Sequence, residues 1–387
     1  MACFVLLSDR ASTHSCAALI SNVAHTGCLI VHRPEHLLQK IGCYKGRVLL
    51  FVDLRPNHFD LLESLHLLGQ AHFSGTLVFI DSSDARPAYS ASVLARHFGL
   101  DVMRCIPAQP SEQDILSLLI DWEVRPPVLR RALRKTYSSH EIQVAIEKKQ
   151  LVNYYQPKIS LADHRFHGVE LLARWEHPDD GLVFPDQFIG TAEDSALIDE
   201  LTLAVLDRGL ADFEKWKSHN LEPELAINLS MESLQRPRFI DRLRRKLAHQ
   251  CAYLPLITLE VTESRLMRDP LSTLSALTRL RLGSLILSID DFGTGHASLA
   301  QLRDIPFDEI KIDRGFISDV HRNPIHQAIY QGILSMAKGM GIRTVAEGVE
   351  TSEELDFLRK TGCDHAQGYL LARPMPADDI ISFAKNA

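Results

Sequence analysis

Residues 285–293 read LILSIDDFG, a run of aliphatic residues that ends in the paired acids Asp290 and Asp291. A short aliphatic run of this kind is typical of a buried parallel strand. Eight such runs occur in the C-terminal part of the chain, and each ends in a side chain that can bind a metal ion or a phosphate: Gln156, Glu170, Asn228, Glu260, Asp290, Lys311, Glu347 and Gln367. Polar groups at the carboxyl ends of eight strands predict a TIM-like (β/α)8 barrel with its functional site at that face.

The lengths of the connections predict the directions of the strands. Gln156 and Glu170 are too close in sequence for a helical crossover, so the segment between them, LADHRFHG, predicts a hairpin and an antiparallel first strand. The long gap between Glu170 and Asn228 predicts two helices. Before the first strand, SSHEIQVAIEKKQ predicts a helix with Ser139 as its N-cap.

The composition is that of an ordinary globular protein. The chain has 387 residues, of which 45% are hydrophobic and 24% charged, and its formal net charge is −7. This balance argues against binding of a nucleic-acid polymer, which needs a basic face. No apolar run is long enough to span a membrane, and the first residues lack the basic segment of a signal peptide. The seven cysteines are dispersed and form no CxxC pair, so we expect a cytoplasmic protein with reduced thiols.

The chain divides into two predicted domains and a linker. Residues 1–121 alternate aliphatic strands with helical segments, which predicts a flavodoxin-like (βα)5 domain with a parallel sheet and helices on both faces. Residues 122–138 contain Pro126, Pro127 and a cluster of arginines, which is typical of an interdomain linker. A basic arm that binds nucleic acid is the alternative, and the shortness of the segment disfavours it. Residues 139–387 form the predicted barrel.

The acids at the strand ends indicate a site for a divalent cation. Glu170, Asn228, Glu260 and Asp290 end consecutive strands in this part of the barrel, and Asp291 follows directly. Oxygen ligands at this density favour Mg²⁺ or Mn²⁺ over zinc. Because several carboxylates in one barrel mouth repel each other, a bound cation would neutralise them. Any one of these acids taken alone could equally be a loop residue or a helix cap.

Several motifs in the barrel region occur together in one known family. They are YYQPK (Tyr154–Lys158), VELLARW (Val169–Trp175), NLS (Asn228–Ser230), LEVTES (Leu259–Ser264), DDFGTG (Asp290–Gly295), IKID (Ile310–Asp313), AEGVE (Ala346–Glu350) and QGYLLARPMP (Gln367–Pro376). In this order they resemble the EAL-domain phosphodiesterases, which hydrolyse cyclic di-GMP to the linear dinucleotide pGpG. The tripeptide that names the family is ELL here, with Leu171 in place of alanine. Because the acid is kept as Glu170, we expect little chemical consequence.

The resemblance implies a metal-dependent catalytic centre. The implied metal ligands are Glu170, Asn228, Glu260, Asp290 and Asp291. They would hold two ions of Mg²⁺ or Mn²⁺ per active site, with Asp290 bridging them, and the ions would clamp the phosphodiester and ionise the attacking water. Lys311 would hold that water, and Glu347 would be the general base or an acid linked to the metals. Glu263 resembles the acid that pins the loop FGTGHASL, in which His296 takes the place of an aromatic residue and is expected to be a surface histidine.

The resemblance also implies a set of substrate-binding residues, namely Gln156, Arg174, Glu350, Gln367 and Asp313. Arg174 could form two hydrogen bonds to a phosphate, and the two glutamines would contact the ligand. Glu350 would lie near a guanine, and Asp313 would support the loop after Lys311. These positions carry no exchange that would damage the chemistry, so hydrolysis is expected.

The N-terminal domain resembles the receiver domains of two-component signalling, and the layout of the chain is similar to RocR-type response regulators. Asp53 is the candidate phosphoacceptor, with Asp9 as a neighbouring acid and Ser82 or Ser83 as the hydroxyl. A second acid is missing, and the stretch that should supply a lysine, RCIPAQP, has none. Without these partners Mg²⁺ would bind poorly and the phosphorylated state would lack its charge partner. A degenerate receiver used for dimerisation or docking is the alternative to a phosphorylated one.

The sequence therefore predicts a cyclic di-GMP phosphodiesterase regulated by a receiver-like domain. The main alternative is a slow or inactive receptor that binds the same nucleotide, and a barrel hydrolase for another phosphodiester is a third. The expected partners are cyclic di-GMP, a histidine kinase or other signalling protein at the N-terminal domain, and a second copy of the chain. Neither membrane binding nor binding to a nucleic-acid polymer is expected.

Overall fold

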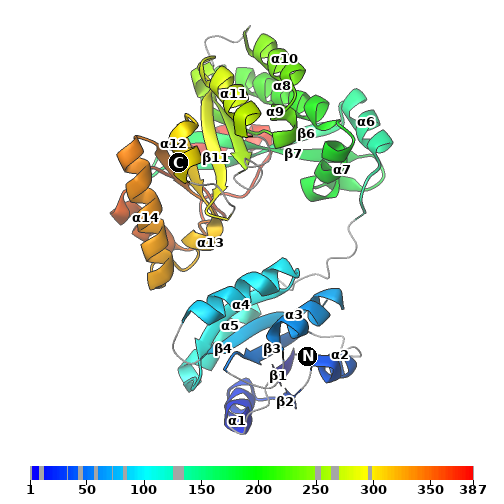
Figure 1. Cartoon of the computed structure of the whole chain (residues 1–387), viewed down its shortest axis with the longest axis vertical. Coiled ribbons are helices and arrows are strands. Elements are labelled where there is room, and N and C mark those ends of the chain that lie inside the picture. The colour runs from blue at the N-terminus through cyan, green and yellow to red at the C-terminus, as the bar shows by residue number, and fades with distance from the viewer. Residues whose placement is uncertain are drawn as a thin grey trace. The chain divides into compact units, whose positions relative to one another are not determined.

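The structure is a computed structural model that describes residues 2–7, 13–32, 34–41, 47–55, 60–71, 73–81, 85–124, 135–248, 254–262, 270–294 and 299–386. The chain forms two compact units, Met1–Arg134 and Lys135–Ala387, drawn in Figure 1. The division falls inside the predicted linker, and helix α5 runs to Val124, so it takes in the first residues of that linker. In the described ranges, no helix is both long and apolar enough to cross a membrane.

The N-terminal unit is a parallel sheet with the strand order β2-β1-β3-β4-β5. Its elements are β1 (Ala2–Leu7), α1 (Thr13–Ala24), β2 (Cys28–Val31), α2 (Pro34–Ile41), β3 (Arg47–Asp53), α3 (Leu61–Gln70), β4 (Thr76–Asp81), α4 (Ala85–His97), β5 (Asp101–Pro107) and α5 (Glu112–Val124). Leu50 of β3 packs with apolar residues of α2, α3 and α4, whereas Leu49 and Phe51 pack with those of α1 and α5. Alternate residues of a strand thus fill two cores, which confirms the predicted sheet with helices on both faces.

The second unit contains the strands of the barrel. They are β6 (Leu151–Ser160), β7 (Phe166–His177), β9 (Glu224–Asn228), β10 (Ile257–Thr262), β11 (Ile286–Phe292), β12 (Glu309–Ile312), β13 (Arg343–Ala346) and β14 (His365–Ala366). Each strand pairs with the next in this order, and β6 pairs with both β14 and β7, which closes the barrel. A short strand, β8 (Gly181–Val183), also pairs with the end of β7 as a hairpin. β6 is antiparallel to both neighbours, as the short connection after it predicted, and the other barrel pairs are parallel.

The helices of this unit cover the outside of the strands. They are α6 (Ser139–Glu147), α7 (Ile189–Asp194), α8 (Ile198–Lys217), α9 (Met231–Leu234), α10 (Pro237–Ala248), α11 (Pro270–Arg281), α12 (Leu299–Asp304), α13 (Arg314–Ile317), α14 (Pro324–Met340), α15 (Ser352–Thr361) and α16 (Ala377–Asn386), with 3-10 turns η1 (Pro185–Gln187) and η2 (Leu254–Leu256). The long helix α8 packs against β6, β7 and β9, and α14 packs against β12 and β13 (Figure 1). The two helices predicted between Glu170 and Asn228 are α7 and α8, whereas β8 was not expected.

The prediction of Ser139 as the cap of the first barrel helix was wrong by one residue. Ser138 is the N-cap of α6, and its hydroxyl accepts a hydrogen bond from the backbone N–H of Glu141. The Glu141 carboxylate accepts one from the backbone N–H of Ser138 at 2.9 Å. The reciprocal pair needs an acid three residues after the cap, and only Ser138 meets that spacing.

Charged residues fill the end of the barrel where the parallel strands begin. Lys158 of β6 is fully buried, and its Nζ lies 3.0 Å from Glu224 Oε1 and 3.6 Å from Glu309 Oε1. Arg343 lies 3.0 Å from the second oxygen of Glu224 and 3.3 Å from that of Glu309. The two acids and two bases balance in charge, so this cluster closes the base of the barrel without needing an added ion.

Candidate active site at the carboxyl ends of the barrel strands

Lys311 of β12 lies at the centre of the candidate site and is only 1% exposed. Its Nζ is 2.8 Å from Glu347 Oε1, 3.0 Å from Glu260 Oε2, 3.0 Å from Asp290 Oδ1 and 3.4 Å from Glu170 Oε2. The four acids come from β7, β10, β11 and the residue after β13. The barrel therefore brings residues that are far apart in sequence to a single buried cation at the strand ends.

Three amides complete the wall around Glu170. Asn228 Nδ2 donates to Glu170 Oε1 at 2.9 Å, and Gln367 Nε2 donates to Glu170 Oε2 at 2.7 Å. The same Gln367 group donates to Gln156 Oε1 at 3.1 Å, which follows from the pairing of Gln156 opposite Glu170 in the β6–β7 ladder. Burial raises the pKa of Glu170, but Lys311 and the two donated hydrogen bonds outweigh it, so the pKa lies below its usual range.

A second group of acids lies beside the lysine. Asp290, Asp291 and Glu347 each present a carboxylate oxygen, and these oxygens lie within 4.8 Å of one another. In a regular strand, Asp290 and Asp291 would point to opposite faces of the sheet. Here the register between β11 and β12 shifts between Ile289 and Phe292, and Asp291 has a φ of 52°. This irregularity turns the second acid toward the first.

The site carries more negative charge than its own lysine can balance. Burial, followed by repulsion from Asp290 and Asp313, raises the pKa of Asp291 to about 6. Burial, with repulsion from neighbouring acids and against the attraction of Lys311, raises the pKa of Glu347 to about 8. Burial also raises the pKa of Glu260 well above its usual range. Carboxylates crowded in this way are neutralised by protons or by cations, so the site favours the binding of divalent ions.

The donor set fits Mg²⁺ or Mn²⁺. Glu260 Oε1 is buried and has no hydrogen-bond partner among the described residues, while its other oxygen faces Lys311. Together with the carboxylates of Asp290 and Asp291, the site offers oxygen atoms and no sulfur or imidazole ligand within the described group. Hard oxygen ligands of this kind are those that Mg²⁺ and Mn²⁺ prefer.

The remaining predicted residues lie further out. Arg174 of β7 is buried, and its guanidinium carbon lies 5.6 Å from the Tyr154 ring centre and 5.0 Å from that of Phe184. Asp313 caps α13 through a 2.8 Å hydrogen bond from the Gly315 N–H. Glu350 is exposed and its carboxylate lies 2.8 Å from Arg314 Nη2. Glu263 and His296 lie outside the described residues.

In the N-terminal unit, Asp53 ends β3 and is 2% exposed. Arg55 Nε donates to Asp53 Oδ1 at 2.8 Å, and Arg55 Nη2 donates to Oδ2 at 2.6 Å. The backbone N–H of Arg55 also donates to Oδ1. Both oxygens of the candidate phosphoacceptor are thus held by one guanidinium. Asp9, Ser82 and Ser83 lie outside the described residues.

Sequence reasoning missed Glu354, a buried acid of α15 that holds the loop carrying Glu347 and Glu350. A signal for it was present, because Thr351 and Glu354 have the T-x-x-E spacing of a capping box directly after the AEGVE motif. The base cluster around Lys158 was also missed, and charged residues at the first positions of β9, β12 and β13 were its signal.

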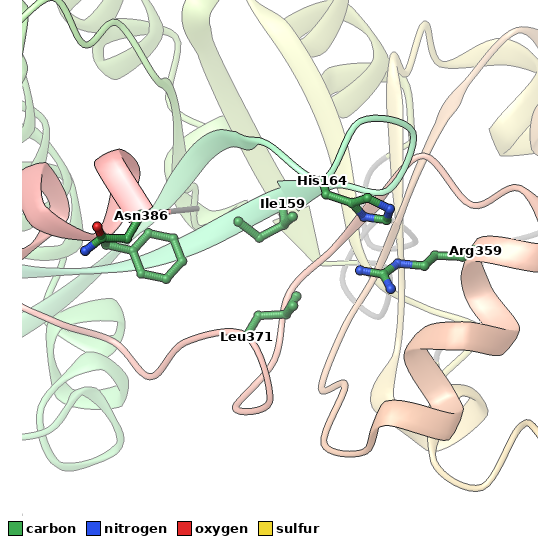
Figure 2. Close-up of a pocket in the computed structure, with 6 residues that line it drawn as sticks. Ile159, His164, Arg359, Leu371 and Asn386 are labelled. Carbon is green, nitrogen blue, oxygen red and sulfur yellow. The ribbon is translucent and has the colours of Figure 1, made fainter.

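A separate hollow of about 260 Å³ lies between the β6–β7 turn, α15 and α16 (Figure 2). Its lining residues are Ile159, His164, Arg359, Leu371, Phe383 and Asn386. None of them belongs to the group around Lys311, so this hollow is distinct from the candidate active site.

The fold and the site together define a closed β/α barrel with one antiparallel strand and an acidic, lysine-centred basin suited to divalent cations. The chain belongs to the EAL domain family, whose model matches residues 139–374. Among curated relatives it is 40% identical over 259 residues to the cyclic di-GMP phosphodiesterase NbdA of Pseudomonas aeruginosa, an alignment that covers 67% of this chain and 33% of NbdA. The chain thus spans about one third of the length of that relative.

Two further similarities concern the whole layout and the barrel alone. The chain is 30% identical over 331 residues to the cyclic di-GMP phosphodiesterase RocR of P. aeruginosa, and the alignment covers 84% of each chain. A solved structure described as the PaMucR phosphodiesterase in complex with c-di-GMP matches with a TM-score of 0.59 and 39% identity. That match covers 62% of this chain and 98% of the solved one.

Proposed function

We propose that this protein hydrolyses cyclic di-GMP to linear pGpG with the help of Mg²⁺ or Mn²⁺. The observation that carries the proposal is the position of Lys311, whose ammonium lies within 3.4 Å of carboxylates from β7, β10, β11 and the residue after β13. A phosphodiester entering this basin would find buried charge of both signs already in place, which is how protein sites stabilise charge that develops in a transition state. The names of NbdA, RocR and the PaMucR complex support cyclic di-GMP as the substrate.

The proposed ligands for two metal ions are Glu170, Asn228, Glu260, Asp290 and Asp291. Bound there, Mg²⁺ or Mn²⁺ would supply Lewis-acid activation of the phosphodiester and of a water molecule. The chain's own contribution is to hold these oxygens in place. Asn228 and Gln367 fix both oxygens of Glu170, and the irregular register of β11 turns Asp291 toward Asp290.

Two residues are proposed to act on protons and charge. Lys311 holds the attacking water at Nζ and offsets the negative charge that develops on the phosphoryl oxygens. Glu347, which lies 2.8 Å from Lys311 Nζ, accepts a proton from that water; it must be ionised to do so, and cations bound beside it would favour that form. Glu263, in the untested role of a loop anchor, completes the proposed catalytic set.

The proposed substrate contacts surround this centre. Arg174 presents its guanidinium to a phosphate, and Gln156 and Gln367, which already hydrogen-bond each other, contact the ligand. Glu350 is placed to accept a hydrogen bond from a guanine, and Asp313 supports the segment after Lys311 by capping α13.

The direct test is an incubation of the purified chain with cyclic di-GMP and Mn²⁺, followed by chromatography for pGpG. Glu170→Ala should abolish turnover, because it removes a proposed metal ligand held by Lys311, Asn228 and Gln367. Glu222→Ala is the matched control, since Glu222 is an exposed acid of the same unit, and its carboxylate lies 3.8 Å from Lys217 Nζ, outside the group around Lys311. Full activity in Glu170→Ala would refute the ligand assignment. Tight binding of cyclic di-GMP without pGpG in the wild type would instead indicate a receptor.

We further propose that the N-terminal unit is a degenerate receiver that regulates the barrel. Its strand order, 2-1-3-4-5, is that of flavodoxin-like folds, and the similarity to RocR extends over most of the chain. Because Arg55 already holds both oxygens of Asp53, we favour docking of a signalling partner over phosphoryl transfer from a histidine kinase. Turnover of the full chain compared with residues 135–387 alone would report the sign of regulation, and light scattering would report whether the chain forms the expected homo-oligomer.

A further inference from the structure

Glu354 is a buried acid whose partners are backbone amides from two different loops. It is 3% exposed and lies in the first turn of α15. Its Oε2 accepts hydrogen bonds from the N–H groups of Glu350 at 3.0 Å and Thr351 at 3.1 Å. Its Oε1 accepts one from the N–H of Asp319 at 2.9 Å. A carboxylate that accepts several backbone hydrogen bonds forms charge-assisted contacts, which are stronger than neutral ones.

Helix capping explains only part of this arrangement. Thr351 is the N-cap of α15, and its hydroxyl accepts a hydrogen bond from the N–H of Glu354 while Glu354 returns one to the N–H of Thr351. That exchange is an ordinary capping box. The bond to Asp319 lies outside it, because Asp319 belongs to the turn between α13 and α14. The second oxygen of Glu354 therefore connects α15 to a segment that the cap does not need.

The two segments that Glu354 joins follow the strands of the proposed catalytic residues. Asp319 lies in the segment after β12, the strand that carries Lys311. Glu350 lies in the loop after β13, which begins with Glu347. The start of this loop is held by the barrel, since the N–H of Glu347 donates to Ile312 O at 3.1 Å. Its end is held by Glu354.

The ion pair between these segments is weaker. Arg314 Nη2 lies 2.8 Å from Glu350 Oε2, but the two side chains are 52% and 40% exposed. Exposed ion pairs contribute little because water and salt screen them. Within the loop, Gly348 has a φ of 64° and packs so closely on Arg314 that a Cβ would lie 2.5 Å from that side chain. The loop thus makes a tight turn, and Glu354 is its buried side-chain anchor beside the backbone hydrogen bond from the Val349 N–H to Gln367 O at 3.1 Å.

We propose that Glu354 is a positioning residue that holds the Glu347 loop against the Lys311 segment and so maintains the Lys311–Glu347 contact of 2.8 Å. This inference rests on the proposed function for its catalytic consequence. The role of Glu354 in holding the two segments together can be tested without measuring hydrolysis.

The test compares Glu354→Gln with Glu353→Gln in the full-length protein. The glutamine keeps the size of the side chain but replaces one acceptor oxygen with an NH₂ group that cannot accept the amide hydrogen bonds. Glu353 is the adjacent, exposed residue of the same helix turn, so its variant controls for the loss of an acid near the helix N-terminus. The readouts are backbone hydrogen exchange in peptides containing Asp319 and Glu350, Mn²⁺ affinity by calorimetry, and kcat and KM for cyclic di-GMP.

In Glu354→Gln one of the two oxygens becomes an NH₂ group, so we expect faster exchange in the peptide whose N–H faces that group, weaker Mn²⁺ binding, and a kcat lower by about 10- to 100-fold, the usual effect of losing a residue that orients metal-site groups. KM should stay close to the wild-type value, and Glu353→Gln should behave as wild type. Unchanged exchange in both peptides, or a lowered melting temperature with wild-type kcat and Mn²⁺ affinity, would overturn the inference. If wild-type protein makes no pGpG while exchange and Mn²⁺ affinity respond as stated, the proposed function fails and the positioning role stands.

Discussion

Replacement of Lys311 by methionine tests the charge balance of the site. Methionine keeps the length and apolar character of the stem and removes only the ammonium. In the metal-free protein, this leaves Glu170, Glu260, Asp290 and Glu347 without the cation that lies 2.8–3.4 Å from each of them. Removing one partner of a buried ionic group typically costs about 3–5 kcal/mol, because the opposite charges stay buried without compensation.

The size and sign of the effect can be stated for a melting experiment. A loss of about 3–5 kcal/mol corresponds to a fall in melting temperature of about 6–20 °C for a unit of this size. The charge of Lys311 lowers the pKa values of Glu170, Glu260 and Glu347, so these three pKa values should be higher in the variant than in the wild type. The folded variant then binds more protons than the folded wild type between pH 6 and pH 8, and its deficit in stability grows as the pH rises.

The assay is thermal unfolding by circular dichroism at pH 6 and pH 8, with and without Mn²⁺. Mn²⁺ should restore much of the lost stability, since binding at about 100 times Kd contributes about 2.7 kcal/mol. It should not restore hydrolysis, because the proposed water-holding group is gone. Lys360→Met, an exposed lysine of α15, is the control and should melt as wild type. A Lys311→Met protein that melts at the wild-type temperature at pH 8 without metal would refute the account of the basin.

Three further outcomes follow from the same contacts. Burial raises the pKa of Glu347 from 4.5 to about 8, so between these values the folded state holds a proton that the unfolded state has released. The metal-free protein should therefore lose stability between about pH 5 and pH 8, and Mn²⁺ should suppress this loss. A melting temperature that rises over this range would contradict the raised pKa. Lys158→Met removes the cation 3.0 Å from Glu224 at the other end of the barrel. This change should lower the free energy of unfolding by about 3–5 kcal/mol and leave kcat at 25 °C unchanged. A loss of kcat in protein that is still folded would show that this cluster acts on the active site. Acetyl phosphate should add no phosphoryl group to Asp53 in intact-mass spectra of the wild type, because Arg55 holds both carboxylate oxygens. A mass increase of one phosphoryl group on Asp53 would contradict this reading.

The convergence of the strand-end residues could be predicted because one simple rule places them. Parallel strands of a β/α barrel all end at the same face, so a polar residue at each strand end is enough to expect a common site. Gln156 is the exception, since its strand runs the other way, and the short connection to Glu170 revealed that direction from the sequence alone.

Other features depend on geometry that residue order does not carry. A regular strand would place Asp290 and Asp291 on opposite faces, and only the shifted register and the positive φ of Asp291 bring them together. The sequence places Lys311 at the site but does not indicate that four acids converge on it. The cap at Ser138, in contrast, could have been predicted, because of the two adjacent serines only Ser138 has an acid three residues later.

Buried acids away from the strand ends were harder to anticipate. Glu354 has the spacing of a helix cap, and nothing in its sequence context indicates the bond to Asp319, because that partner lies in another loop. Glu224 and Glu309 begin their strands, where a charged residue is usually expected to face solvent. Their partners, Lys158 and Arg343, come from other strands and become neighbours only when the barrel closes.

The most direct test of the central claim is anomalous diffraction at the manganese edge from crystals grown with Mn²⁺. Anomalous peaks are expected at coordination distance from oxygens of Glu170, Glu260, Asp290 and Asp291, with Lys311 displaced from at least one of its present contacts. Ordered acids that remain paired with Lys311, with no anomalous signal among them at saturating Mn²⁺, would contradict the account.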